Sequence, residues 1–154
     1  MQHYDKKHLF TFGGEHKRFT AGTERVVVNF RGVRILLEVC YDLRFPVWSR
    51  NLGDYDMILY VASWPTPRVD AWSALLRARA IENQCYVAGV NRMGTDPTCE
   101  YSGGSAIIDP YGKTIAECPW SRESAVSADI DMEALQAFRK KFPVLDDADP
   151  FTLI

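Results

Sequence analysis

The segment Arg34–Pro46, with the sequence RILLEVCYDLRFP, joins a short apolar run to a single cysteine. The run Ile35–Val39 is nearly continuous, which predicts a strand buried on both faces. Pro46 suits the first turn of a helix, and we expect that helix to cover residues 45–52. Cys40 then lies at a strand-to-helix turn, where free backbone N–H groups and the helix dipole stabilise a thiolate. The segment alone leaves two interpretations open: Cys40 is a nucleophile, or it is a small buried hydrophobe like most unpaired cysteines.

The composition is that of one globular domain. The chain has 154 residues, of which 47% are hydrophobic and 25% charged, which is enough to form a core. The net charge of −2 and the absence of a basic stripe argue against nucleic acid or an anionic membrane as partners. The apolar runs are only as long as strands, and the N-terminus has no apolar signal segment, so we expect a cytoplasmic protein. The cysteines have no C-x-x-C spacing, which favours reduced thiols; they are Cys40, Cys85, Cys99 and Cys118.

The rest of the chain alternates strand-like and helix-like patterns, which predicts an α/β fold. We expect strands over residues 26–30, 33–39, 57–63, 85–90, 105–109, 114–116 and 125–130, helices over 69–83 and 132–142, and a polar loop over 91–100. A strand, a helix and a strand in that order imply parallel strands, which puts Cys40 and the loop at Trp64 on the same sheet edge. Trp64 is either a pocket wall or part of the packing. Arg79 falls at the margin of the apolar stripe of its helix, so its head group must reach water or a carboxylate.

Several ordered motifs resemble the nitrilase (carbon–nitrogen hydrolase) superfamily. They are Tyr4–Phe10 (YDKKHLF), Val39–Pro46 (VCYDLRFP), Arg77–Gln84 (RARAIENQ) and Asp109–Gly112 (DPYG). Within that superfamily the likeness is to the omega-amidase branch, through Gly14–His16, Cys40–Asn51 and Trp64–Pro65. The resemblance implies an α-β-β-α sandwich, in which two sheets lie between helix layers, and a homodimer built around a two-fold interface.

The resemblance also implies a role for each candidate site residue. Cys40 attacks an amide carbonyl carbon and forms a thioester acyl-enzyme. Lys6 stabilises the oxyanion together with the backbone N–H of Tyr41. Glu15 matches an accessory glutamate that positions the substrate or the lysine, and Trp64 walls the substrate pocket. No cofactor is implied, because cysteine, lysine, glutamate and water suffice for this chemistry.

The general-base glutamate of the family has no counterpart in this sequence. In the family it lies upstream of the lysine motif, and Glu15, Glu24 and Glu38 do not occupy its position. We therefore expect residues 1–154 to form a carbon–nitrogen hydrolase domain that lacks its N-terminal part, so that only the C-terminal portion of the sandwich is present. Glu38 itself stands where a smaller or uncharged residue is expected, so it either alters the pocket or points to a polar network.

Two classes of function remain open at this stage. One is an amidase for small omega-amides, such as the transamination products of glutamine, with the missing glutamate supplied by another segment or a second chain. The other is a non-catalytic fragment or subunit of the same fold. Arg68 and Arg92 are candidates for binding a substrate carboxylate, although both are equally compatible with ordinary surface arginines.

Overall fold

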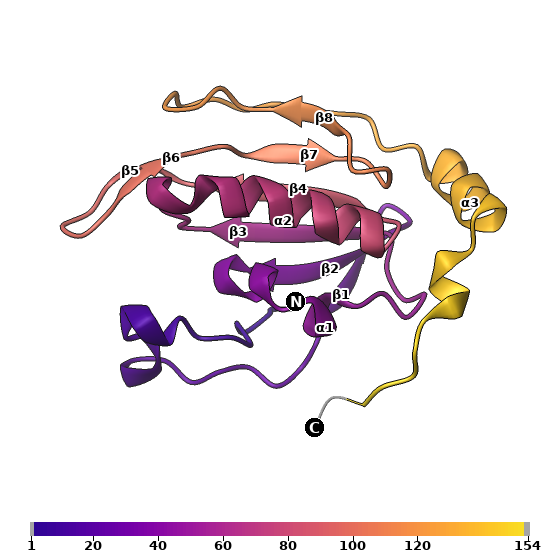
Figure 1. Ribbon diagram of the computed structural model, residues 1–154, viewed down its shortest axis with the longest axis horizontal. Coiled ribbons are helices and arrows are strands. Elements are labelled where there is room, and N and C mark those ends of the chain that lie inside the picture. The colour runs from indigo at the N-terminus through magenta and orange to yellow at the C-terminus, as the bar shows by residue number, and fades with distance from the viewer. Residues whose placement is uncertain (1, 153–154) are drawn as a thin grey trace.

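The computed structural model describes residues 2–152 and is built on one six-stranded sheet with a separate two-stranded hairpin (Figure 1). The sheet strands, in spatial order, are β1 (Val27–Phe30), β2 (Val33–Val39), β3 (Met57–Ala62), β4 (Tyr86–Asn91), β7 (Ala106–Ile108) and β8 (Thr114–Glu117). The three central strands β2, β3 and β4 run parallel, and the outer pairings are antiparallel. The predicted α/β class is therefore confirmed. Within the described residues, no helix is long and apolar enough to cross a membrane.

Helix α2 (Val69–Glu82) covers one face of this sheet (Figure 1). The apolar core lies between the helix and the sheet; its largest fully buried side chains include Leu36, Ile58, Tyr60, Trp72, Leu76 and Val87. The approach is close at Gly89 of β4, where an added Cβ would lie 2.5 Å from a methyl carbon of Leu76. Arg79 of α2 is 3% exposed and pairs with Glu82 at 2.8 Å, so its head group binds a carboxylate instead of reaching water.

The other face of the sheet is only half-buried. Val61 and Val90 are 48% and 49% exposed there, whereas Leu36 on the helix side has no exposed surface. The prediction that the strand over 35–39 is buried on both faces is therefore wrong for residues 2–152, because their helices pack on one side only.

The helix expected over residues 45–52 is much shorter. α1 covers only Pro46–Ser49, and a 3-10 turn over Cys40–Arg44 precedes it. The helix does not continue to residue 52, because the side-chain amide of Asn51 donates hydrogen bonds to the backbone carbonyls of Tyr55 and Asn83.

Two further expectations fail. The region expected as a polar loop contains a hairpin, β5 (Met93–Thr95) and β6 (Glu100–Ser102), whose turn is held by Asp96. Residues 125–130 form no strand, because they pair with no other strand in residues 2–152.

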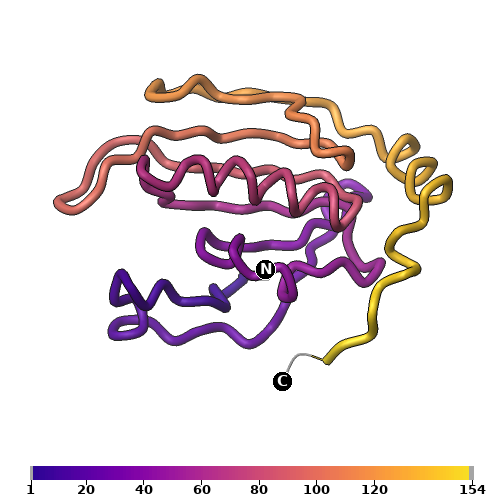
Figure 2. The backbone as a smooth tube through the Cα atoms, viewed as in Figure 1, coloured from indigo at the N-terminus to yellow at the C-terminus, as the bar shows by residue number. Residues whose placement is uncertain are grey.

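Helix α3 (Met132–Lys141) matches the prediction for 132–142. It lies at the end of the sheet opposite the N-terminal segment that precedes β1 (Figure 2). The side chain of Asp131 caps its N-terminus by accepting the N–H of Ala134. Arg139 then fixes the helix by donating to Asp56 and to the carbonyls of Tyr55 and Gln84. These partners precede β3 and β4, so α3 covers the amino ends of the parallel strands and leaves their carboxyl ends free.

Candidate active site

A cavity of roughly 1110 Å³ opens at the carboxyl ends of the parallel strands. All five residues predicted for the site line it: Lys6, Glu15, Cys40, Tyr41 and Trp64. Open α/β sheets place their sites at this edge. The predicted positions therefore converge in space, although they come from four separate parts of the chain.

Cys40 directly follows the last residue of β2 and has a φ of +49°, in the left-handed region. Such a backbone costs about 1–3 kcal/mol in a residue other than glycine and is found mostly where surrounding structure enforces it. Burial raises the pKa of the Cys40 thiol, and the nearby Lys6 ammonium offsets only part of that effect. The helix that follows Cys40 directly is the 3-10 turn Cys40–Arg44, which Cys40 begins, whereas α1 starts only at Pro46. Burial therefore outweighs the favourable charge of Lys6 in the pKa of the Cys40 thiol.

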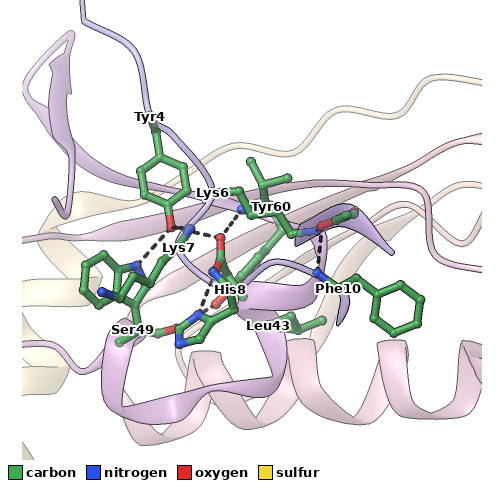
Figure 3. Close-up of polar contacts among 12 residues, drawn as sticks. Tyr4, Lys6, Lys7, His8, Phe10, Leu43, Ser49 and Tyr60 are labelled. Atoms are coloured by element: carbon green, nitrogen blue, oxygen red, sulfur yellow. Dashed lines mark hydrogen bonds and ion pairs between the residues drawn. The ribbon is translucent and has the colours of Figure 1, made fainter. Parts of the chain in front are cut away.

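Lys6 and Glu15 form a close ion pair beside this cysteine. The Lys6 Nζ lies 2.6 Å from Oε2 and 2.9 Å from Oε1 of Glu15, and Oε2 also accepts the backbone N–H of Phe10 at 2.8 Å (Figure 3). Partial burial would raise the pKa of the Glu15 carboxyl, but these hydrogen bonds and the charge of Lys6 bring it below its usual value. Glu15 is thus a carboxylate paired with Lys6 at the wall of the cavity.

The Trp64 loop forms a rigid wall of the cavity. The Trp64 ring is only 3% exposed and packs on Trp72 with ring centres 5.5 Å apart, so most of it belongs to the core. Its backbone is held by the side chain of Asn91, which accepts the Trp64 N–H at 2.7 Å and donates to the Trp64 carbonyl at 3.0 Å. Most of the Trp64 ring is therefore part of the hydrophobic core, and the loop that carries it forms the wall of the cavity.

Two arginines line the cavity without an ion-pair partner among the described residues. The guanidinium of Arg44 lies 4.9 Å from the ring centre of Trp64, and that of Arg68 lies 5.4 Å from the ring centre of Phe10. Stacking on aromatic rings orients a guanidinium and leaves its N–H groups available to an anion. Arg92 does not line the cavity but stacks on Tyr101. The sequence analysis named Arg68 as a candidate for binding a substrate carboxylate but did not name Arg44. The only indication for Arg44 in the sequence is its position in the motif that contains Cys40.

Glu38 is a buried carboxyl group in β2. Its side chain is buried under the helix layer, and neither carboxylate oxygen has a hydrogen-bond partner within residues 2–152. Burial, reinforced by the charge of Asp42, raises the pKa of the Glu38 carboxyl well above its usual value. Glu38 is also absent from the cavity lining, which argues against the altered pocket. Its neighbours are polar, because the charges of Arg25 and Arg79 and the Ser49 hydroxyl offset part of the rise in its pKa.

Comparison with known proteins gives consistent results. The carbon-nitrogen hydrolase family matches residues 1–140. The chain is 56% identical over 151 residues to omega-amidase YafV of Escherichia coli, a match that takes in 97% of this chain and 59% of the relative. It is 42% identical to the 2-oxoglutaramate amidase of Bacillus subtilis, over 96% of this chain and 57% of that protein.

The fold also matches a solved structure of the same superfamily. A CN-hydrolase superfamily protein from Xanthomonas campestris, with an arsenic adduct in its active site, superposes with a TM-score of 0.95 at 48% identity. This match covers 99% of the present chain and 61% of the other. The chain therefore spans about three fifths of the length of these relatives. Because the family match extends over residues 1–140, it does not bear out the expectation that only a C-terminal portion is represented.

Proposed function

Because the chain belongs to the carbon–nitrogen hydrolase family, we propose that it acts in the hydrolysis of small amides, with Cys40 as the nucleophile. The observation that carries this proposal is the convergence of Cys40 and the Lys6–Glu15 ion pair in one cavity. A thiol on a tight turn next to a fixed ammonium supplies both a nucleophile and a positive charge for the oxyanion that its attack creates.

The chemistry proceeds in two halves. The Cys40 sulfur bonds to the amide carbonyl carbon, and the resulting oxyanion is stabilised by the Lys6 ammonium and the Tyr41 backbone N–H. Collapse of this intermediate breaks the C–N bond, and the leaving nitrogen takes up a proton and departs as ammonia. Water then attacks the thioester, releases the carboxylate product and restores the thiol. Each oxyanion donor typically contributes about 2.7–4 kcal/mol to such a step.

The attack requires a base, because burial holds Cys40 as a thiol. Among the described residues, the carboxylates that line the cavity are Asp5 and Glu15. Asp5 is largely exposed and lies beside His3, and Glu15 is occupied by Lys6 with a lowered pKa. We therefore assign the general base to a glutamate outside residues 2–152. A group of this kind is worth a factor of about 10²–10⁴ in rate.

The half-exposed face of the sheet supports the same assignment. Val61 and Val90 leave an apolar surface there, which in a two-sheet sandwich packs against the second sheet. We propose that further polypeptide covers this face in the active enzyme and brings the general base to the cavity. In this arrangement residues 1–154 belong to a carbon–nitrogen hydrolase domain that is not complete by itself.

The substrate we propose is a small omega-amide that carries a carboxylate at its other end. Arg44 and Arg68 provide orientable cations at the cavity wall, and the Trp64 loop bounds the space between them and Cys40. The names omega-amidase and 2-oxoglutaramate amidase of two relatives agree with this substrate class. We further propose a homodimer in the cytoplasm, a reducing compartment that suits the four free cysteines.

The test is ammonia release from a panel of small amides that includes the omega-amide of a keto acid. The assay compares this chain alone, a version extended at its N-terminus, and the Cys40→Ala variant of each, with Cys118→Ala as a matched control that removes a thiol remote from the cavity. We expect turnover by the extended protein, its loss in Cys40→Ala, and little change in Cys118→Ala. Activity that survives the loss of Cys40 would refute the mechanism, and silence of the extended protein would favour a non-catalytic member of the fold.

A further inference from the structure

One buried carboxylate joins the two segments that form the candidate active site. Asp42 has no exposed surface, and its two oxygens accept four hydrogen bonds. Its Oδ2 accepts the Tyr4 hydroxyl at 2.9 Å and the Val39 N–H at 3.1 Å. Its Oδ1 accepts the backbone N–H of His8 at 2.8 Å and lies 2.9 Å from the His8 Nδ1 (Figure 3).

The residues that donate to Asp42 are neighbours in sequence of the two reactive side chains. Tyr4 and His8 lie two residues before and two residues after Lys6, whereas Val39 immediately precedes Cys40. Asp42 therefore holds the Tyr4 side chain and the His8 backbone on the two sides of the lysine and, through the same carboxylate, the Val39 backbone at the entry to the cysteine turn. The Glu15 ion pair restrains only the head group of Lys6.

We propose that Asp42 is a positioning residue that fixes Lys6 relative to the Cys40 thiol. The inference rests on the function proposed above for its catalytic meaning, but the geometry that it asserts does not depend on turnover. An ionised carboxylate with four donors is suited to this task, because it accepts at both oxygens. An asparagine at this place would direct an N–H₂ group at two of the donors and would leave them unpaired.

The direct test is the rate at which a small alkylating agent modifies Cys40, followed site by site with mass spectrometry so that the other thiols do not interfere. The Lys6 ammonium favours the thiolate form of Cys40, and the thiolate is the form that reacts. The Asp42 charge itself disfavours the Cys40 thiolate, so removing it without displacing Lys6 would speed the reaction. We expect Asp42→Asn to slow the reaction instead, by up to about fivefold, the effect of losing one nearby unit charge in a wet site. Lys6→Met should slow it similarly, and the double variant should react no more slowly than Lys6→Met alone.

A control is available in Asp109. This aspartate accepts the backbone N–H groups of Tyr111 and Lys113 in the turn between β7 and β8, and neither it nor these donors line the cavity. Asp109→Asn should leave the alkylation rate of Cys40 unchanged. Alkylation of Asp42→Asn at the wild-type rate, or slowing that multiplies with that of Lys6→Met, would overturn the proposal.

A milder variant covers the case in which Asp42→Asn does not fold, as judged by circular dichroism. Tyr4→Phe removes one of the four donors and should slow alkylation in the same direction by a smaller factor; no slowing in this variant would then refute the proposal. In the catalytically active protein, kcat should fall by about 100-fold for Asp42→Asn, with KM changed much less. Survival of activity in Cys40→Ala would defeat the proposed function, while the alkylation rates would still decide the role of Asp42.

Discussion

Replacing Glu38 by glutamine should change how the stability of this chain depends on pH. Glu38 is 2% exposed, and neither of its carboxylate oxygens has a partner within the described residues. Burial and the neighbouring Asp42 charge favour the neutral carboxyl and raise its pKa in the folded chain well above the usual value, although Arg25, Arg79 and Ser49 offset part of this effect. Folding at neutral pH therefore requires either proton uptake or a buried charge.

The sign and the upper limit of the effect follow from linkage. The contribution of a carboxyl whose pKa is raised by folding is fully present below its unfolded pKa, about 4.3, and is lost as the pH rises through the folded pKa. In that window the free energy of unfolding falls by at most about 1.36 kcal/mol per pH unit. The glutamine side chain in Glu38→Gln has no titratable group. The free energy of unfolding of this variant, relative to that of the wild type, should therefore increase by up to about 2.7 kcal/mol between pH 5 and pH 7.

Urea unfolding of the two proteins at several pH values between 4.5 and 7.5, followed by circular dichroism, measures this difference. Glu24→Gln is the matched control, because Glu24 is an exposed glutamate of the same chain. The reasoning is refuted if the unfolding free energies of wild type and Glu38→Gln run parallel over this range. Parallel curves would mean that the Glu38 carboxyl is solvated or paired in solution.

Three other outcomes are expected. The alkylation of Cys40 should have a pH midpoint above that of a free cysteine, about 8.5, because burial raises its pKa, and Lys6→Met should move the midpoint higher still; a midpoint below the free value would contradict the site electrostatics. Gly89→Ala should lower the free energy of unfolding by about 1–3 kcal/mol, since the new methyl would lie 2.5 Å from a side-chain carbon of α2, and urea titration with no measurable loss would argue against that close packing. Arg139→Met should speed proteolytic cleavage around α3, because Asp56 then loses one of its cationic partners and the helix its anchor; an unchanged digestion rate would show that other contacts hold α3.

Much of the fold followed from local patterns in the sequence. The apolar run before Cys40 gave β2, the stripe of Trp72 and Leu76 gave α2, and the turn over Pro110–Lys113 gave the hairpin of β7 and β8. These predictions succeeded because periodicity and turn chemistry act over a few residues. The strand expected over 125–130 failed because a strand also needs a pairing partner, which an apolar alternation does not provide.

The candidate site was predictable in its residues but not in its electrostatics. The motifs that resemble the family named Lys6, Glu15, Cys40, Tyr41 and Trp64, and the structure brings all five to one cavity. The direction of the pKa shift of Cys40 was not predictable from the sequence, because it depends on the burial of the thiol and on its distance to charges elsewhere in the chain.

By itself, the sequence determined the α/β class, the order of the main elements and the cysteine at the end of a central strand. Only the tertiary structure decided that Asp42 joins the lysine segment to the cysteine turn, that Glu38 is buried without a partner, and that one sheet face stays half-exposed. The physical reason is that hydrogen bonds between distant segments, desolvation and packing depend on which residues are in contact in the folded chain. Local sequence patterns do not specify those contacts.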